Sequence, residues 1–117
     1  MKISHALIAL ASILPSLAFA QANTPRVDQR QINQERRIDQ GVASGSLTRY
    51  ETYRLGRGQQ HVANMESRAK ADGVVTRQER AHLYRAQDRQ SERIYAQKHD
   101  RQHDYNHNGR IDRRYYR

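Results

Sequence analysis

The chain has 117 residues, no cysteine, no tryptophan and a formal net charge of +9. Val, Ile, Leu and Met occupy only thirteen positions after residue 20, and the mean hydropathy is −1.09. This composition excludes a disulfide scaffold and argues against the large apolar interior of an enzyme, whereas abundant Arg, Gln, Glu and Ala favour long helices around a thin core.

Residues 1–20 have the pattern of a cleavable export signal, with a positive charge at Lys2, an apolar run from Ala6 to Phe19 and a small residue, Ala20, before the cut. Ala22 offers a second cleavage position. The apolar run is too short for a membrane span, and no later segment is apolar enough to be a transmembrane segment. We therefore expect a soluble mature protein, periplasmic or secreted, that begins after Ala20 or Ala22.

Three helices are expected within residues 21–101, at approximately 24–40, 48–70 and 76–101. A polar loop and a basic tail follow over residues 102–117. The first helix opens with a threonine and a proline, and proline is well tolerated at the first helical position.

The second and third helices begin at two similar corners, 28 residues apart. Gly45 and Gly73 can adopt the left-handed conformation that follows a helix end. The segments Thr48–Glu51 and Thr76–Glu79 each have the Thr-x-x-Glu pattern of a capping box, in which the two side chains satisfy free backbone N–H groups. The corners therefore predict two helix–turn–helix connections.

Apolar residues in the second helix recur at intervals of seven, three and four residues: Leu55, Val62, Met65 and Ala69. In the third helix, Leu83 and Ile94 lie eleven residues apart, which is three turns along one side. These spacings indicate plain core packing between helices. We expect an all-α fold, an antiparallel helical hairpin or three-helix arrangement with a thin core, which a homodimer could complete.

No nucleophile constellation and no glycine-rich phosphate loop is present, so we do not expect an enzyme or an organic cofactor. The densest group of possible metal ligands is His99, Asp100, His103, Asp104 and His107. If the third helix continues to residue 104, His99 and His103 lie one turn apart on one face. Imidazoles at that separation can chelate Zn, Cu or Ni, with His107 as a third ligand. The alternative is that these are ordinary polar residues near a helix C-terminus.

The overlapping segment Asp104-x-Asn106-x-Asn108-Gly109-x-Ile111-Asp112 resembles an EF-hand or dockerin-type calcium loop. The resemblance implies five ligands: the side chains of Asp104, Asn106 and Asn108, the backbone carbonyl of Arg110, and Asp112 directly or through water. The family's final acidic ligand is replaced by Tyr115. The alternative is a polar turn that uses Gly109 for its backbone freedom. The two corners share the EF-hand register but lack the early carboxylates, so they are EF-hand-like in shape only.

One further resemblance and one pattern of charges indicate possible binding partners of the protein. Leu47–Glu51 and Val75–Glu79 resemble the Leu-Thr-x-x-Gln motifs of Spy/CpxP-type periplasmic proteins, with Glu in place of Gln. That resemblance implies a basic stress chaperone or sensor that dimerises and binds unfolded client proteins. Arg85, Arg89 and Arg93 form a stripe that could meet an anionic envelope surface, although acidic residues are interleaved with it. Export argues against nucleic acid as the partner.

These patterns support three functions. The leading hypothesis is an exported helical protein that binds a divalent metal ion near its C-terminus, as a buffer or a sensor. The alternatives are a Spy/CpxP-like chaperone or interaction module without metal, and a protein that binds polyanions.

Overall fold

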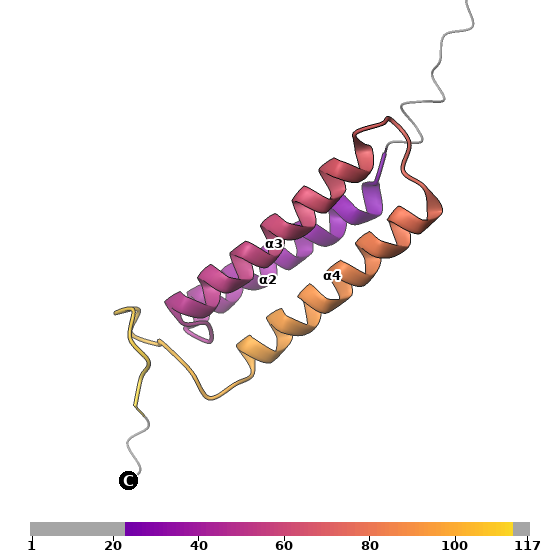
Figure 1. The fold of residues 1–117 in the computed structure, drawn as a ribbon. Helices are drawn as coiled ribbons and strands as arrows, with labels where there is room; N and C mark the ends of the chain where they lie inside the picture. The colour runs from indigo at the N-terminus through magenta and orange to yellow at the C-terminus, as the bar shows by residue number, and fades with distance from the viewer. Residues whose placement is uncertain (1–22, 114–117) are drawn as a thin grey trace, which may run out of the picture.

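The computed structural model describes residues 23–113, and in that part of the chain it contains three α-helices and no strand. They are α2 (Pro25–Ser44), α3 (Arg49–Lys70) and α4 (Arg77–Lys98). The helices lie side by side, with α3 antiparallel to α2 and α4 packed against both (Figure 1). The expected all-α, three-helix arrangement is therefore confirmed, while the expected export signal lies outside the described residues.

Both predicted capping boxes are present. The Thr48 backbone N–H donates to the Glu51 carboxylate at 2.8 Å, and the Glu51 N–H donates to the Thr48 hydroxyl at 3.3 Å. The corresponding distances for Thr76 and Glu79 are 2.8 and 3.1 Å. These reciprocal bonds satisfy backbone donors that the first helical turn leaves free, which explains why α3 and α4 begin where they do.

The end of α2 differs from the sequence-based expectation, because the helix continues through Gly41 to Ser44. Gly41 is buried, and a Cβ atom at this position would lie 2.5 Å from Leu47 Cδ1. The missing side chain therefore allows Leu47 to fold back onto the last turn of α2. Gly45, at a φ of 75°, is the residue that ends this helix.

Most of the buried apolar residues in the described part of the chain form two clusters, one at each end of the bundle, and Val62 and Ala86 are buried outside them. The first contains Val27, Ala69, Val75 and Leu83, with Met65 and Tyr84 packed against it. The second contains Ile38, Leu47, Leu55 and Ile94. This confirms the packing roles expected for the recurring apolar residues of α3 and α4 and the expected thin core.

A layer of buried glutamines lies between the two apolar clusters: Gln34, Gln59, Gln87 and Gln90. The side-chain amide of each donates to a backbone carbonyl oxygen of a neighbouring helix, at distances from 2.8 to 3.4 Å. The side-chain oxygens of all four have no hydrogen-bond partner among the described residues. The glutamine layer connects the three helices, but it leaves four buried acceptors unsatisfied.

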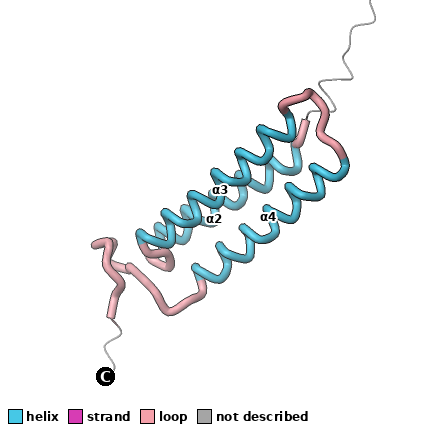
Figure 2. The backbone as a smooth tube through the Cα atoms, in the orientation of Figure 1, coloured by secondary structure: helices cyan, strands magenta, loops and turns pink. Residues whose placement is uncertain are grey.

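The segment after α4 contains no further helix within the described residues, and it returns to the end of the bundle where α2 meets α3 (Figure 2). The helix α4 itself ends at Lys98, three residues before the expected end at Arg101. The chain leaves the helix at His99, whose φ is −116°. The Asp100 carboxylate then accepts a hydrogen bond from the Gln102 N–H at 2.8 Å, which stabilises a turn in place of another helical turn.

Candidate metal site in the C-terminal loop

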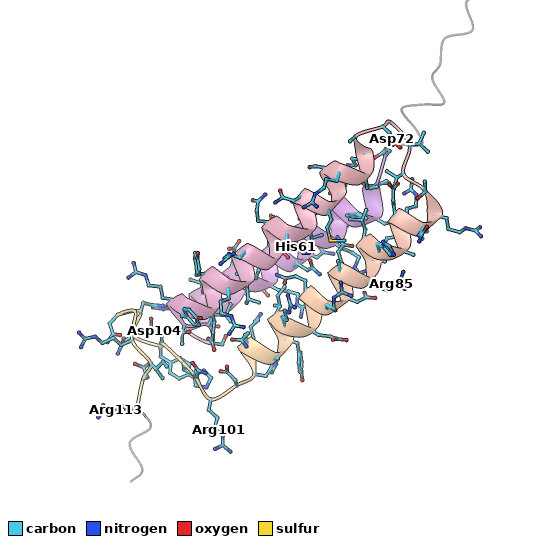
Figure 3. The ribbon with its side chains drawn as sticks, viewed as in Figure 1. His61, Asp72, Arg85, Arg101, Asp104 and Arg113 are labelled. Carbon is cyan, nitrogen blue, oxygen red and sulfur yellow. The ribbon has the colours of Figure 1, made fainter. Side chains whose placement is uncertain are left out.

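The loop over residues 104–112 is anchored on the corner between α2 and α3. The Asp104 N–H donates to the Gly45 carbonyl oxygen at 2.9 Å, and Asp104 is only 6% exposed. Figure 3 shows Asp104 beside this corner. The loop and this corner are so close that a Cβ atom on Gly45 would lie 2.6 Å from the Cα atom of Tyr105. Gly45 therefore both ends α2 and provides the docking surface for the loop.

Side-chain oxygens organise the first half of the loop by accepting backbone N–H groups. The Asp104 carboxylate accepts from Asn108 at 3.0 Å and from Gly109 at 2.9 Å. The Asn106 side-chain oxygen accepts from the same Asn108 N–H at 3.1 Å, and the Asn108 side-chain oxygen accepts from Arg110 at 2.8 Å. Because one N–H bonds to both Asp104 and Asn106, these two oxygens lie on the same side of the loop.

Two residues in the left-handed region produce the tight curl of this loop. His107 has a φ of 56° and Gly109 a φ of 79°. Glycine adopts such an angle without strain, whereas a histidine does so at a steric cost that the surrounding hydrogen bonds must offset. Gly109 thus adopts the left-handed backbone conformation that its lack of a side chain allows, as expected from the sequence.

Asp112 closes the loop from its other end. Its carboxylate accepts from the Tyr105 N–H at 2.6 Å and from the Asn106 side-chain amide at 2.9 Å. Its own N–H donates to the His103 carbonyl oxygen at 2.7 Å. The Asp112 carboxylate therefore contacts Asn106, another of the donors that the calcium-loop resemblance implies.

The charges around the loop are mixed. Asp104 and Asp112 are its two carboxylates, and Asn106 and Asn108 are uncharged. The side chain of Arg49 passes within 3.8 Å of the position that a Cβ atom on Gly109 would occupy. A guanidinium group this close reduces the attraction of the loop for a cation. With this balance of charges, the loop would bind a cation only weakly.

The premise of the histidine site, a helix that continues to residue 104, is wrong because α4 ends at Lys98. His99 stacks on Tyr95 with ring centroids 4.0 Å apart, and its Nδ1 lies 2.7 Å from the Tyr95 carbonyl oxygen. His103 instead stacks on Tyr105 at 4.7 Å, and His107 is exposed. Within residues 23–113, no three His, Asp or Glu side chains are gathered in a way that could hold a metal ion.

Asp100, the remaining sequence-predicted ligand, lies next to a buried carboxyl group that the sequence patterns did not single out as a site. Glu51 is 2% exposed, and burial is the largest cause that raises its pKa, with the neighbouring Asp100 carboxyl acting in the same direction. The hydrogen bonds from Thr48 oppose this shift without cancelling it. Asp100 therefore lies beside the first turn of α3.

Among the helices of residues 23–113, none is long and apolar enough to cross a membrane. The chain matches no protein-family model, no curated protein and no solved structure.

Proposed function

We propose that this protein is a small exported calcium-binding protein and that the loop over residues 104–112 takes up the ion. The observation that carries this proposal is the set of side-chain-to-backbone bonds within the loop. Counted from Asp104 as position one, they join position one to positions five and six, three to five, and five to seven. Asparagine and aspartate oxygens arranged in this way, with glycine at position six, are typical of the EF-hand-type loop that the sequence resembles.

The donor chemistry supports calcium over a transition metal. Calcium prefers six to eight oxygen ligands from carboxylates, amides and backbone carbonyls, and it tolerates irregular geometry. The loop offers such oxygens on Asp104, Asn106, Asn108, Arg110 and Asp112. Zn, Cu and Ni prefer imidazole nitrogens, and the histidines of residues 23–113 belong to no group of three or more His, Asp or Glu side chains that could hold such an ion.

The expected affinity is low, with a dissociation constant of about 10⁻⁴ to 10⁻³ M, as in extracellular calcium modules. Two carboxylates and the nearby Arg49 set this limit. An affinity in that range suits an exported protein that responds to the calcium of its surroundings. Since the loop docks on Gly45, ion binding would stabilise the contact between the C-terminal segment and the α2–α3 corner, which is the behaviour of a sensor.

The test is calorimetric titration of the mature chain with calcium, beside Asp104→Asn and a His99/His103/His107→Ala triple variant. Asp104→Asn keeps the shape of the side chain and removes half of the loop's carboxylate charge, so calcium binding should weaken at least tenfold. The triple variant should bind calcium as the unmodified chain does. A mature chain that gives no signal at millimolar calcium, or a triple variant that loses the calcium signal, would refute the proposal.

The alternative function is a metal-independent chaperone or interaction module of the Spy/CpxP type. It is supported by Tyr50 and Tyr53, which are 68% and 62% exposed on α3. Such a protein should suppress the aggregation of unfolded clients at near-stoichiometric ratios, in calcium or in chelator alike. Suppression that requires calcium would instead connect both activities to the loop.

A further inference from the structure

A basic groove runs between α3 and α4. Two adjoining hollows of about 400 and 180 Å³ form it, and both are lined by Gly58, His61 and Arg93. Gly58 creates the space, because a Cβ atom there would lie 2.1 Å from the side-chain oxygen of Gln90. His61 lies halfway along α3 (Figure 3).

The walls of the groove carry four arginines and one histidine, all exposed: Arg54, Arg57 and His61 on α3, and Arg89 and Arg93 on α4. None of the residues that line it, within the described chain, is Asp or Glu. The groove is therefore strongly electropositive, and its low-dielectric walls concentrate that field.

The acidic residues interleaved with the arginines of α4 do not line the groove. Asp88 forms an ion pair with Arg30 of α2, so its charge is compensated on the side of α4 that faces α2. Glu92 lies three residues after Arg89 on the outer surface of α4, and it does not line the groove. Acidic and basic residues alternate in the sequence of this helix, but of these described residues only the arginines line the groove.

The groove's shape and composition indicate its ligand. Guanidinium groups one helical turn apart on α4, about 6 Å along the axis, match a chain that carries anionic groups at regular intervals. The floor residues Val62 and Ala86 are only 2% and 5% exposed, so they provide no apolar anchor for a peptide. Among the described residues that line the groove there is no Tyr, Phe or Trp on which the bases of a nucleic acid could stack.

We infer that the α3–α4 groove binds a linear anionic glycan through its sulfate or phosphate groups. Arginine donates two parallel hydrogen bonds to such groups, which makes it better suited than lysine to this contact. A flat anionic membrane would reach only the rims of a groove that lies between two helices. The inference is independent of calcium binding, since the groove and the 104–112 loop share no residue.

The test measures binding of a heparin-derived decasaccharide, as the sulfated probe, to the mature chain and to two double variants. Arg57→Gln/Arg93→Gln removes one charge from each wall of the groove. The matched control, Arg26→Gln/Arg36→Gln, removes the same net charge from exposed positions on α2. We expect the groove variant to bind about tenfold or more weakly, which corresponds to about 1.4 kcal/mol, and the control to change by less than about threefold.

Equal losses in the two variants, or no binding of the decasaccharide at low salt, would overturn the inference. Single-stranded oligonucleotides and anionic phospholipid vesicles serve as competing ligands in the same assay. If either binds the unmodified chain as tightly as the glycan does and shows the same loss in the groove variant, the assignment of a glycan is wrong. Unchanged helicity and calcium affinity in both variants would establish that the fold and the loop are intact.

Discussion

The fully buried side-chain amide of Gln87 donates a 2.8 Å hydrogen bond to the backbone carbonyl oxygen of Val27 on the neighbouring helix. Gln34 of α2 reciprocates with a 2.8 Å bond to the backbone oxygen of Gln87. The two bonds hold α2 and α4 in one register at the middle of the bundle. Polar bonds of this kind specify an alignment that apolar packing alone would leave freer to slide.

The glutamine layer should cost stability. Replacing Gln87 by Met keeps the side-chain volume and removes a buried oxygen that has no partner among the described residues. We expect Gln87→Met to raise the free energy of unfolding by about 1 kcal/mol, because the desolvation cost of the oxygen exceeds the value of the lost bond. Urea denaturation measures this, with the exposed position Gln40→Met as the control. A loss of stability would instead show that the bond to Val27 dominates.

The Glu66 carboxylate should make the protein sensitive to acid. Burial alone would raise its pKa, but hydrogen bonds from Lys70 and Thr24 and the charge of Lys70 together hold the pKa below its ordinary value of 4.5. A lowered pKa in the folded state means that this contribution is complete above pH 4.5 and is lost as the pH falls through the folded-state pKa. Thermal unfolding between pH 7 and 2 should therefore show a steeper acid decline for the unmodified chain than for Glu66→Gln. Parallel curves would contradict this role.

Two glycines with similar backbone angles separate the cost of strain from the cost of losing the docked loop. Gly45 and Gly73 have φ values of 75° and 82°. A Cβ atom on Gly45 would meet the backbone of Asp104 and Tyr105, whereas one on Gly73 would meet no atom of residues 23–113 within 4 Å. Both Ala variants should lose about 1 kcal/mol from backbone strain. Only Gly45→Ala should also release residues 104–112, seen as faster amide hydrogen exchange there. Equal exchange in the two variants would show that the loop does not depend on this contact.

The two glycines inside α3 should respond differently to substitution. Gly56 has open space around its missing side chain, whereas a Cβ atom on Gly58 would lie 2.1 Å from the buried Gln90 side chain. Gly56→Ala should therefore stabilise the protein by about 1 kcal/mol through helix propensity. Gly58→Ala should gain less than that or lose stability, because Gln90 must shift away from its bond to Leu55. Thermal denaturation compares them, and an equal gain would show that Gln90 adapts freely.

The capping boxes, the recurring apolar residues and the loop spacing were all readable in the sequence. Thr48 with Glu51, and Thr76 with Glu79, form bonds between residues three positions apart, so the local sequence is sufficient to specify them. The same holds for the Asp104–Gly109 turn, whose bonds span at most five residues. Periodicity likewise identified Leu83 and Ile94 as core residues, because one face of a helix must be buried.

Contacts between distant segments could be decided only by the tertiary structure. The helix α4 ends earlier than expected, and the Asp104 N–H bonds to the Gly45 carbonyl oxygen. His99 and His103 therefore do not share the helix face on which a longer helix would have aligned them. Arg30 of α2 pairs with Asp88 of α4, and the arginines that line the α3–α4 groove come from two helices far apart in the sequence. The pairing of glutamine amides with backbone oxygens on other helices has no local signature either. Local hydrogen bonding thus determined where α3 and α4 begin, whereas burial and charge pairing across the bundle determined which side chains meet.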